Sequence, residues 1–140
     1  MAKRKTTKRK NLDYYDSLWS ELVKMRAWYK CEYCWKTSHL NSHHIFSRTN
    51  YTTRFDLDNG ICLCSWHHTL LSNFSAHKTP LEFAEWIISV RWEKWYFELK
   101  LKKNKVFDGD YERITKELNE RKDKLTNKSD FLVTIKTNHG

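Results

Sequence analysis

The sequence predicts an α+β fold in which a small core, rich in cysteine and histidine, is braced by helices on both sides in the chain. Segments with helical apolar periodicity flank residues 31–75. That middle segment has no long helical period, and it contains all four cysteines and five of the seven histidines. Two short apolar runs within it, His44–Phe46 and Ile61–Cys64, predict brief strands, and residues 65–72 predict a short helix.

Three longer helices are expected around this core. The first covers residues 11–29, where an apolar stripe recurs at spacings of three and four. The second covers about 79–102, and its start is marked by an N-cap, a first-turn proline and a capping-box acid: Thr79, Pro80 and Glu82. The third covers about 110–125, and residues 131–136 would be a short strand or a disordered tail. We expect the tryptophans of the second helix to be core residues.

Charge is concentrated at the start of the chain. The net charge is +9, and removing the six basic residues of positions 1–10 would leave +3. These residues are Lys3, Arg4, Lys5, Lys8, Arg9 and Lys10. We expect a disordered basic arm over 1–10 that binds polyanions, chiefly nucleic acid; a merely solubilising segment is the alternative. Residues 11–140 would then form a single domain, with a core at about 27–75 and a helical extension at about 79–126.

Hydropathy argues against a membrane or secreted protein. No apolar run approaches the ~20 residues of a membrane span, and no apolar stretch follows the basic start. A cytoplasmic protein without a membrane partner is therefore expected. In such a compartment the cysteines are better explained as metal ligands than as disulfides.

The spacing of the cysteines predicts a structural zinc site. Tetrahedral zinc takes four cysteine or histidine ligands, usually as two closely spaced pairs. Cys31-x-x-Cys34 is one such pair, and Cys64-x-x-His67 is the natural second. Cys62 competes with Cys64, because both lie on the same face of a strand. We prefer Cys64, since it leads the x-x-His spacing, and leave Cys62 as a buried thiol beside the site.

Two histidine doublets predict a second metal site. His43 and His44 are adjacent on an extended segment, so their side chains point to opposite faces. One of them can bind a metal while the other faces a water or the core. His68 follows His67, so His67 can close the zinc site while His68 faces a second ion. Asn59 either makes the turn between the strands or hydrogen-bonds the loop that carries the histidines.

These motifs resemble the HNH endonucleases, whose signature is a ββα-metal core. The matching steps are Cys31-x-x-Cys34, His43-His44-Ile45, Asn59 and Cys64-x-x-His67-His68. The chain departs from the family pattern at His67, which stands where a second cysteine is usual but is still a zinc ligand. The resemblance covers about residues 27–75. A narrower set of residues is similar to phage recombination nucleases of the NinG type: His44-Ile45-Phe46-Ser47-Arg48, Arg54-Phe55 and Leu70-Leu71-Ser72.

The resemblance implies hydrolysis of DNA phosphodiester bonds with a single divalent ion. His44 would be the general base that activates a water, and Asn59 would orient its loop. His43 and His68 would hold the ion, which would be Mg²⁺, Mn²⁺, Ni²⁺ or Zn²⁺. A third protein ligand is not evident, because one helical turn after His68 stands Ser72, a poor ligand. The resemblance also suggests phage DNA recombination or processing in an infected bacterial cell.

Basic residues would supply the contacts to DNA, whether double-stranded or branched. Arg48 and Arg54 lie between the two halves of the motif, and the arm would add salt-sensitive affinity. An exposed remainder of the aromatic helices could make a homodimer face. Two other hypotheses remain: a non-catalytic zinc module that binds nucleic acid, and a zinc-stabilised protein-interaction domain whose basic arm meets an acidic partner.

Overall fold

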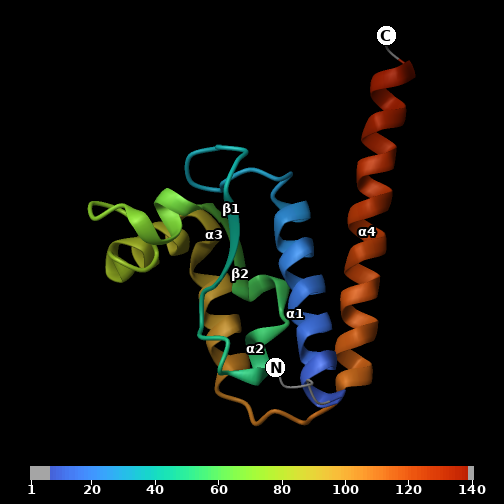
Figure 1. Cartoon of the computed structure of the whole chain (residues 1–140), viewed down its shortest axis with the longest axis horizontal. Coiled ribbons are helices and arrows are strands. Elements are labelled where there is room, and N and C mark those ends of the chain that lie inside the picture. The colour runs from blue at the N-terminus through green and yellow to red at the C-terminus, as the bar shows by residue number, and fades with distance from the viewer. Residues whose placement is uncertain (1–6, 139–140) are drawn as a thin grey trace, which may run out of the picture. The chain divides into compact units, whose positions relative to one another are not determined.

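A computed structural model describes the backbone of residues 7–138 and the side chains of residues 11–128. The elements, shown in Figure 1, are α1 (Thr7–Arg26), β1 (Leu40–His44), α2 (Tyr51–Arg54), η1 (Leu57–Asn59), β2 (Gly60–Cys64), η2 (Trp66–Leu70), α3 (Pro80–Lys103) and α4 (Tyr111–Asn138). The mixture of helices with a small sheet confirms the α+β class. No described helix is both long and apolar enough to span a membrane.

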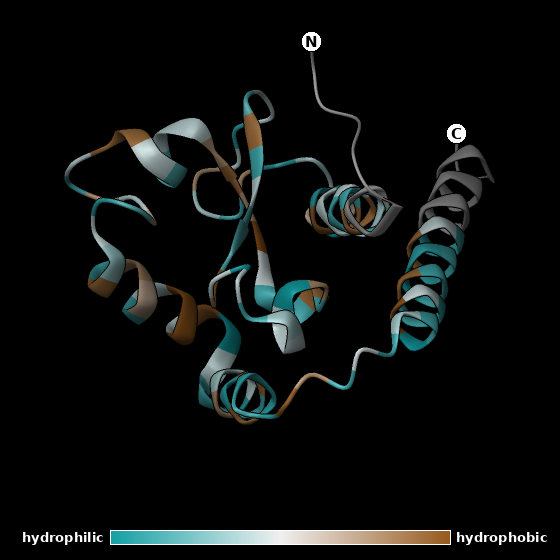
Figure 2. Cartoon of the chain, turned by 60° about the horizontal axis from the view of Figure 1, so that its bottom comes forward, coloured by the Kyte–Doolittle hydropathy of each residue, from teal (hydrophilic) through white to brown (hydrophobic). Residues whose placement is uncertain are grey.

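The chain divides into two compact units, where we expected one domain over residues 11–140. The boundary lies between Asp108 and Gly109. The first unit contains both strands and all of the cysteines. The second unit consists of α4 with the residues next to it, and it is largely hydrophilic (Figure 2).

The sheet is a two-stranded antiparallel hairpin. Its register pairs Leu40 with Cys64 and His44 with Gly60. The first strand therefore ends at His44, where we expected a strand over 44–46. The ladder stops there because the side chain of Asn59 hydrogen-bonds both the N–H and the carbonyl of Phe46, which replaces strand pairing with a loop.

The second strand is buried along its whole length and lies between two helices. On one side, buried residues of α3 pack with Ile61 and Leu63. On the other side α1 contacts both strands, and Trp19 and Val23 are its buried residues nearest to Gly60. A strand covered on both faces has a continuous run of apolar residues rather than an alternating pattern. This explains why all five residues of Gly-Ile-Cys-Leu-Cys are buried.

Side chains from α1 hold the turn before β2. The indole Nε1 of Trp19 donates to the carbonyl of Asp56 at 2.8 Å. The guanidinium of Arg26 donates to the carbonyls of Leu57 at 2.6 Å and Gly60 at 2.7 Å. These long-range bonds satisfy carbonyl groups that the strand ladder does not use, so the helix adds to the turn's own hydrogen bonds, such as that from the Asp58 N–H to the Asp56 carboxylate.

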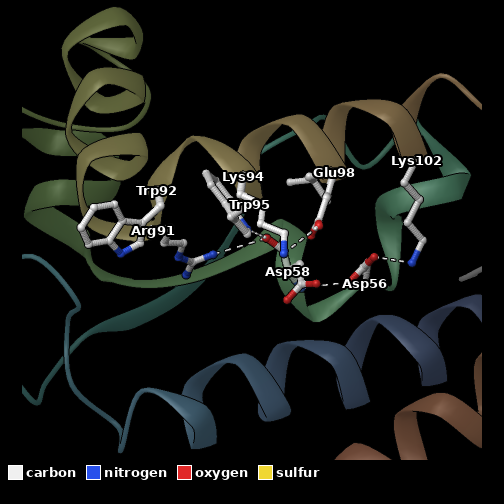
Figure 3. A pocket seen from close by; sticks show the side chains of 9 residues that line it. Asp56, Asp58, Arg91, Trp92, Lys94, Trp95, Glu98 and Lys102 are labelled. Atoms are coloured by element: carbon white, nitrogen blue, oxygen red, sulfur yellow. Dashed lines mark hydrogen bonds and ion pairs between the residues drawn. The ribbon is translucent and has the colours of Figure 1, made fainter.

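Side chains from α3 hold the same turn from the other side (Figure 3). Arg91 donates to the carbonyl of Gly60 at 2.8 Å. As Figure 3 shows, the indole of Trp95 donates to the carbonyl of Asp58, at 2.9 Å. The Arg91 guanidinium also stacks over the Trp95 ring, 5.2 Å from its centroid. The turn is thus clamped between two helices that are far apart in the sequence.

The helix boundaries differ from expectation at both ends of the chain. Helix α1 begins at Thr7, so residues 7–10 are helical rather than part of a disordered arm. Lys3, Arg4 and Lys5 lie outside the described residues, as do the side chains of Lys8, Arg9 and Lys10. Helix α4 continues to Asn138, so the expected strand or disordered tail at 131–136 is wrong. Ion pairs four residues apart, such as Arg113 with Glu117, support the long charged helix.

Helix α3 is interrupted at Trp92, where the backbone is left-handed with φ 76° and ψ 153°. The interruption changes the helical phase, so the buried residues are Phe83, Ile87 and Leu99. Trp92 is 76% exposed, although the stripe in the sequence predicted it to be core. The prediction that Trp92 is a core residue was wrong because it assumed one uninterrupted helix.

Gly60 should be intolerant of a larger residue. An added Cβ would lie 2.4 Å from Cγ2 of Val23 and 2.8 Å from Cζ2 of Trp19. Both atoms belong to buried side chains, so Gly60→Ala should lower the free energy of unfolding by about 1–3 kcal/mol in urea denaturation. Gly109→Ala is the control: its φ is +72° but nothing lies within 4 Å of the added carbon, so it should cost only about 1 kcal/mol of backbone strain. Equal midpoints for Gly60→Ala and wild type would contradict the close approach of α1.

Candidate functional site

Three cysteines and one histidine converge beside the hairpin. The ligand atoms of Cys31, Cys34, Cys64 and His67 all lie within 4.8 Å of one another. The sulfurs of Cys34 and Cys64 are 3.7 Å apart, and Nδ1 of His67 is 3.3 Å from the Cys64 sulfur. In a tetrahedron with zinc–sulfur bonds of about 2.3 Å, neighbouring sulfurs are about 3.8 Å apart. The cluster, which we call the Cys₃His cluster, is therefore compatible with zinc.

A tight turn presents the first two of these cysteines. The backbone N–H of Cys31 donates to the carbonyl of Lys36, and that of Trp35 donates to the carbonyl of Cys31, each at 2.8 Å. Trp35 closes the turn in the left-handed region, with φ 69°. The ring of Tyr33 packs against His67 with a centroid distance of 4.5 Å. The turn and this aromatic contact together orient donors from both halves of the cluster.

Burial and hydrogen bonding shift the pKa values of two of the cluster's thiols in opposite directions. Burial raises the pKa of Cys34 to about 11, and its hydrogen bonds with Cys31 and Cys64 add to this. Burial also acts to raise the pKa of Cys31, but backbone hydrogen bonds, led by that of Cys64, bring it below its ordinary value. A bound divalent cation would allow all three sulfurs to be thiolates together.

Cys62 does not join the cluster. Its side chain is fully buried, and burial together with the nearby Glu32 charge raises the pKa of the Cys62 thiol to about 12. Its backbone N–H donates to the Glu32 carboxylate at 2.7 Å. Of the two candidates on β2, the structure brings Cys64 and not Cys62 to the other donors.

A second cluster consists of three imidazoles, from His43, His68 and His77. Their ring nitrogens all lie within 4.8 Å of one another, and the Nε2 atoms of His68 and His77 are 3.1 Å apart. His43 comes from the end of β1, His68 from η2 and His77 from the loop before α3. His43 and His68 are partly buried, whereas His77 is exposed. We call this set the histidine triad; it opens to solvent on the side of His77.

Backbone hydrogen bonds bring the loop of His77 back to η2. The N–H of His77 donates to the carbonyl of His68 at 3.0 Å, and the N–H of Ala76 donates to the carbonyl of His67 at 2.9 Å. Helix η2 is a single wide turn, closed by a bond from the N–H of Leu71 to the carbonyl of Trp66. The chain then returns alongside that turn, so that consecutive residues of η2 serve two different clusters.

Two of the three imidazoles are shifted towards the neutral form that binds metal ions. Burial, together with positive charge on the neighbouring histidines, lowers the pKa of His43 to about 3. Burial, followed by the charge of His77, also lowers the pKa of His68. Three imidazoles with an open side resemble the ligand set of catalytic zinc sites, which keep one position for water or substrate.

His77 is the functional candidate that the sequence did not reveal. In a regular helix a third ligand would stand one turn after His68, at the position of Ser72, which is a poor ligand. The structure instead uses a histidine nine positions downstream, because η2 ends at Leu70 and the chain turns back. No periodicity marks this spacing. The only signal in the sequence was an unassigned histidine just before the cap of the next helix.

His44 lies on the other face of β1 from the triad, as strand alternation requires. Its ring stacks on Trp19 with centroids 3.8 Å apart and an interplanar angle of 9°. Its Nε2 is 2.9 Å from the carbonyl oxygen of Arg54. Because a carbonyl only accepts, Nε2 carries the proton and Nδ1 carries the lone pair. Burial lowers the pKa of His44, although the bond to Arg54 opposes the shift.

Asn59 fixes the chain immediately after His44. Its side chain is fully buried. Oδ1 accepts from the N–H of Phe46 at 2.7 Å, and Nδ2 donates to the carbonyl of Phe46 at 3.0 Å. The backbone carbonyl of Asn59 also accepts from the N–H of Ile45 at 2.9 Å. Asn59 thus ends the turn before β2, and its hydrogen bonds also hold the loop at Ile45 and Phe46, which follows the two histidines.

The two arginines expected to contact DNA have different environments. Arg54 is only 8% exposed, and its guanidinium donates to both carboxylate oxygens of Asp16, at 3.0 and 2.6 Å. Arg54 is thus a weaker candidate for a phosphate ligand than Arg48, because its guanidinium is already paired with a partly buried carboxylate. The side chain of Arg48 is 60% exposed and makes a single 3.1 Å contact with Asp16. It can still reach a bound anion.

Comparison with known proteins identifies the segment that contains both clusters. Residues 25–77 match the family model described as HNH endonuclease. No curated protein and no solved structure matches the chain. The matched segment begins within the last turn of α1 and ends at His77, so it contains every residue of the Cys₃His cluster and the histidine triad. The match of residues 25–77 to the HNH endonuclease family suggests that the protein is a nuclease.

Proposed function

We propose that the protein is a metal-dependent endonuclease that hydrolyses phosphodiester bonds of DNA at the histidine triad. The observation that carries this proposal is the convergence of three imidazoles, next to but separate from a second cluster that suits zinc. A zinc module that only binds nucleic acid would need the Cys₃His cluster alone. The family match to a nuclease supports the same assignment.

His43, His68 and His77 would hold a divalent ion. Such an ion, when bound, polarises the scissile phosphate and neutralises charge on the leaving oxygen. Imidazole ligands suit Zn²⁺, Ni²⁺ and other transition metals, whereas Mg²⁺ prefers oxygen ligands. Of the four ions considered from the sequence, the donor set therefore favours Zn²⁺ and Ni²⁺, with Mn²⁺ next. The exposed side of the triad at His77 is where a phosphate would enter.

His44 is our candidate for the general base. With Nε2–H held by the carbonyl of Arg54, its Nδ1 is the nitrogen that can accept a proton from water. The stack on Trp19 fixes the plane of the ring. Asn59 is a positioning residue in this scheme, because its two hydrogen bonds to Phe46 fix the chain two residues after His44.

The Cys₃His cluster would hold a structural zinc ion. Its ligands come from the turn after α1, the end of β2 and η2, so a bound ion would add a direct link among three segments that already pack together. His67 and His68 are consecutive. Fixing His67 on zinc would therefore also fix the direction of His68 in the triad.

Contacts to DNA would come from Arg48 and from the basic residues at positions 3–10, whose affinity would be salt-sensitive. The motif similarity to phage recombination nucleases supports a role in processing double-stranded or branched phage DNA. Arg54, whose guanidinium is already paired with Asp16, is the weaker candidate.

Cleavage of supercoiled plasmid tests the proposed function. The zinc-loaded protein should cut with added Ni²⁺, Zn²⁺ or Mn²⁺. His77→Asn should lower the rate by at least roughly a hundredfold, since even the supporting partners of metal ligands are worth 10–100-fold. His39→Asn is the matched control, because this histidine is exposed and belongs to neither cluster. Equal cutting by the two variants would remove His77 from the site. No cutting by folded wild type on plasmid or branched DNA would favour a zinc-containing binding module.

A second variant separates base catalysis from support of the fold. His44→Gln can keep a side-chain N–H for the carbonyl of Arg54 but has no basic nitrogen. We expect it to fold and to lose about 10²–10⁴-fold in the cleavage rate. Circular dichroism and thermal denaturation provide the folding control. Activity close to that of wild type would show that His44 only packs against Trp19.

Zinc content tests the Cys₃His cluster, best measured in the His77→Asn background so that the triad contributes little. Cys34→Ala should lose about one equivalent of zinc by elemental analysis and should unfold at a lower temperature, because a structural zinc contributes directly to folding. Cys62→Ala should retain the zinc, since its thiol lies outside the cluster. Loss of zinc in Cys62→Ala alone would reverse the assignment.

A further inference from the structure

Beside the Cys₃His cluster lies a strip of exposed indole rings alternating with lysines. We call it the indole strip; it consists of Trp28, Lys30, Trp35, Lys36 and Trp66. The three tryptophans are 52%, 73% and 49% exposed in chain order. The Nζ of Lys30 lies 6.0 Å from the centroid of the Trp35 ring, and that of Lys36 lies 5.9 Å from the Trp66 ring. Trp28, Lys30 and Trp35 also line one groove of about 230 Å³.

The backbone of this strip is strained in a way that packing does not explain. Trp28 and Trp35 have positive φ angles of 56° and 69°. For a residue with a bulky side chain this region is sterically unfavourable, whereas glycine occupies it freely. Trp35 therefore neither suits its turn nor gains much burial, since most of its ring faces solvent. Strained residues of this kind cluster at functional sites.

The strip is joined through the chain to both clusters. Trp66 is followed by His67 of the Cys₃His cluster and then by His68 of the triad, all within η2. Trp35 is likewise the residue after the ligand Cys34.

We propose that the indole strip binds unpaired bases of single-stranded DNA next to the triad. Flat, exposed rings can stack on the faces of unpaired bases, whereas in a duplex those faces are covered by neighbouring base pairs. The lysines over the rings provide the positive charge that a phosphate backbone requires. Charge also favours DNA over a protein partner, because the chain carries +9. The proposal deepens the proposed function by assigning it a substrate that contains a single-stranded segment.

Binding of fluorescein-labelled dT₂₀, followed by fluorescence anisotropy without added divalent metal, tests the strip. The full-length protein should bind dT₂₀ more tightly than a 20-base-pair duplex. Trp35→Gly should weaken dT₂₀ binding about tenfold, because stacking on one aromatic ring contributes that order of affinity. The same variant should melt no lower than wild type, since glycine relieves the positive φ. Trp66→Ala should weaken binding to a similar extent while retaining zinc.

Trp92→Gly is the matched control. Trp92 is as exposed as Trp35 and also has a positive φ, 76°, but it lines a different pocket, with Asp58 and Glu98. The Trp92→Gly variant should bind dT₂₀ as wild type does. Unchanged dT₂₀ binding in Trp35→Gly and Trp66→Ala, or tighter binding of the duplex, would contradict the proposal that the strip binds single-stranded DNA. Tighter binding of U₂₀ than of dT₂₀ would overturn the assignment to DNA.

The same proteins distinguish the two proposals. If wild type cuts plasmid but the strip variants bind dT₂₀ normally, the proposed nuclease activity is supported and the binding role of the strip is contradicted. If wild type cuts no DNA but binds dT₂₀ through Trp35 and Trp66, the binding role is supported and the nuclease activity is contradicted.

Discussion

The clamp on the turn before β2 is the constraint on which the rest of the structure depends. Hydrogen bonds from Trp19 and Arg26 of α1, and from Arg91 and Trp95 of α3, converge on carbonyls between Asp56 and Gly60. With the turn held on both sides, Asn59 has one position, and the bonds from its side chain set where β1 ends. The clamp itself acts on backbone carbonyls, whereas Asn59 and Gly60 matter through their own side-chain bonds and close packing.

The two clusters depend on each other through consecutive residues. His67 faces the Cys₃His cluster and His68 faces the triad, so one turn of η2 serves both. On β1 the same principle applies to His43 and His44, whose side chains lie on opposite faces. A structural ion would therefore do more than stabilise the fold, because it would hold η2 in the orientation that brings His68 to His43. His77 is then brought to both by the returning loop.

Prediction from sequence succeeded where chemistry depends on near neighbours in the chain. The pairs Cys31–Cys34 and Cys64–His67 were visible because donors three residues apart share one turn, and the structure brings both pairs together. Prediction failed where position depends on distant segments. Arg54 looked available for phosphate until Asp16, 38 residues earlier, was found against it.

The sequence by itself determined the α+β class and which residue types could bind metal, since local periodicity and short ligand spacings need no knowledge of the fold. Only the tertiary structure decided which donors meet. Cys62 and Cys64 lie on the same face of the strand, and the structure brings Cys64, which the x-x-His spacing also favoured, to the other donors. His77 had no local mark, and the fold brings it to His68 through a loop that runs back along η2. The physical reason is that a ligand set is a property of converging side chains, and convergence depends on contacts between segments that are far apart in the chain.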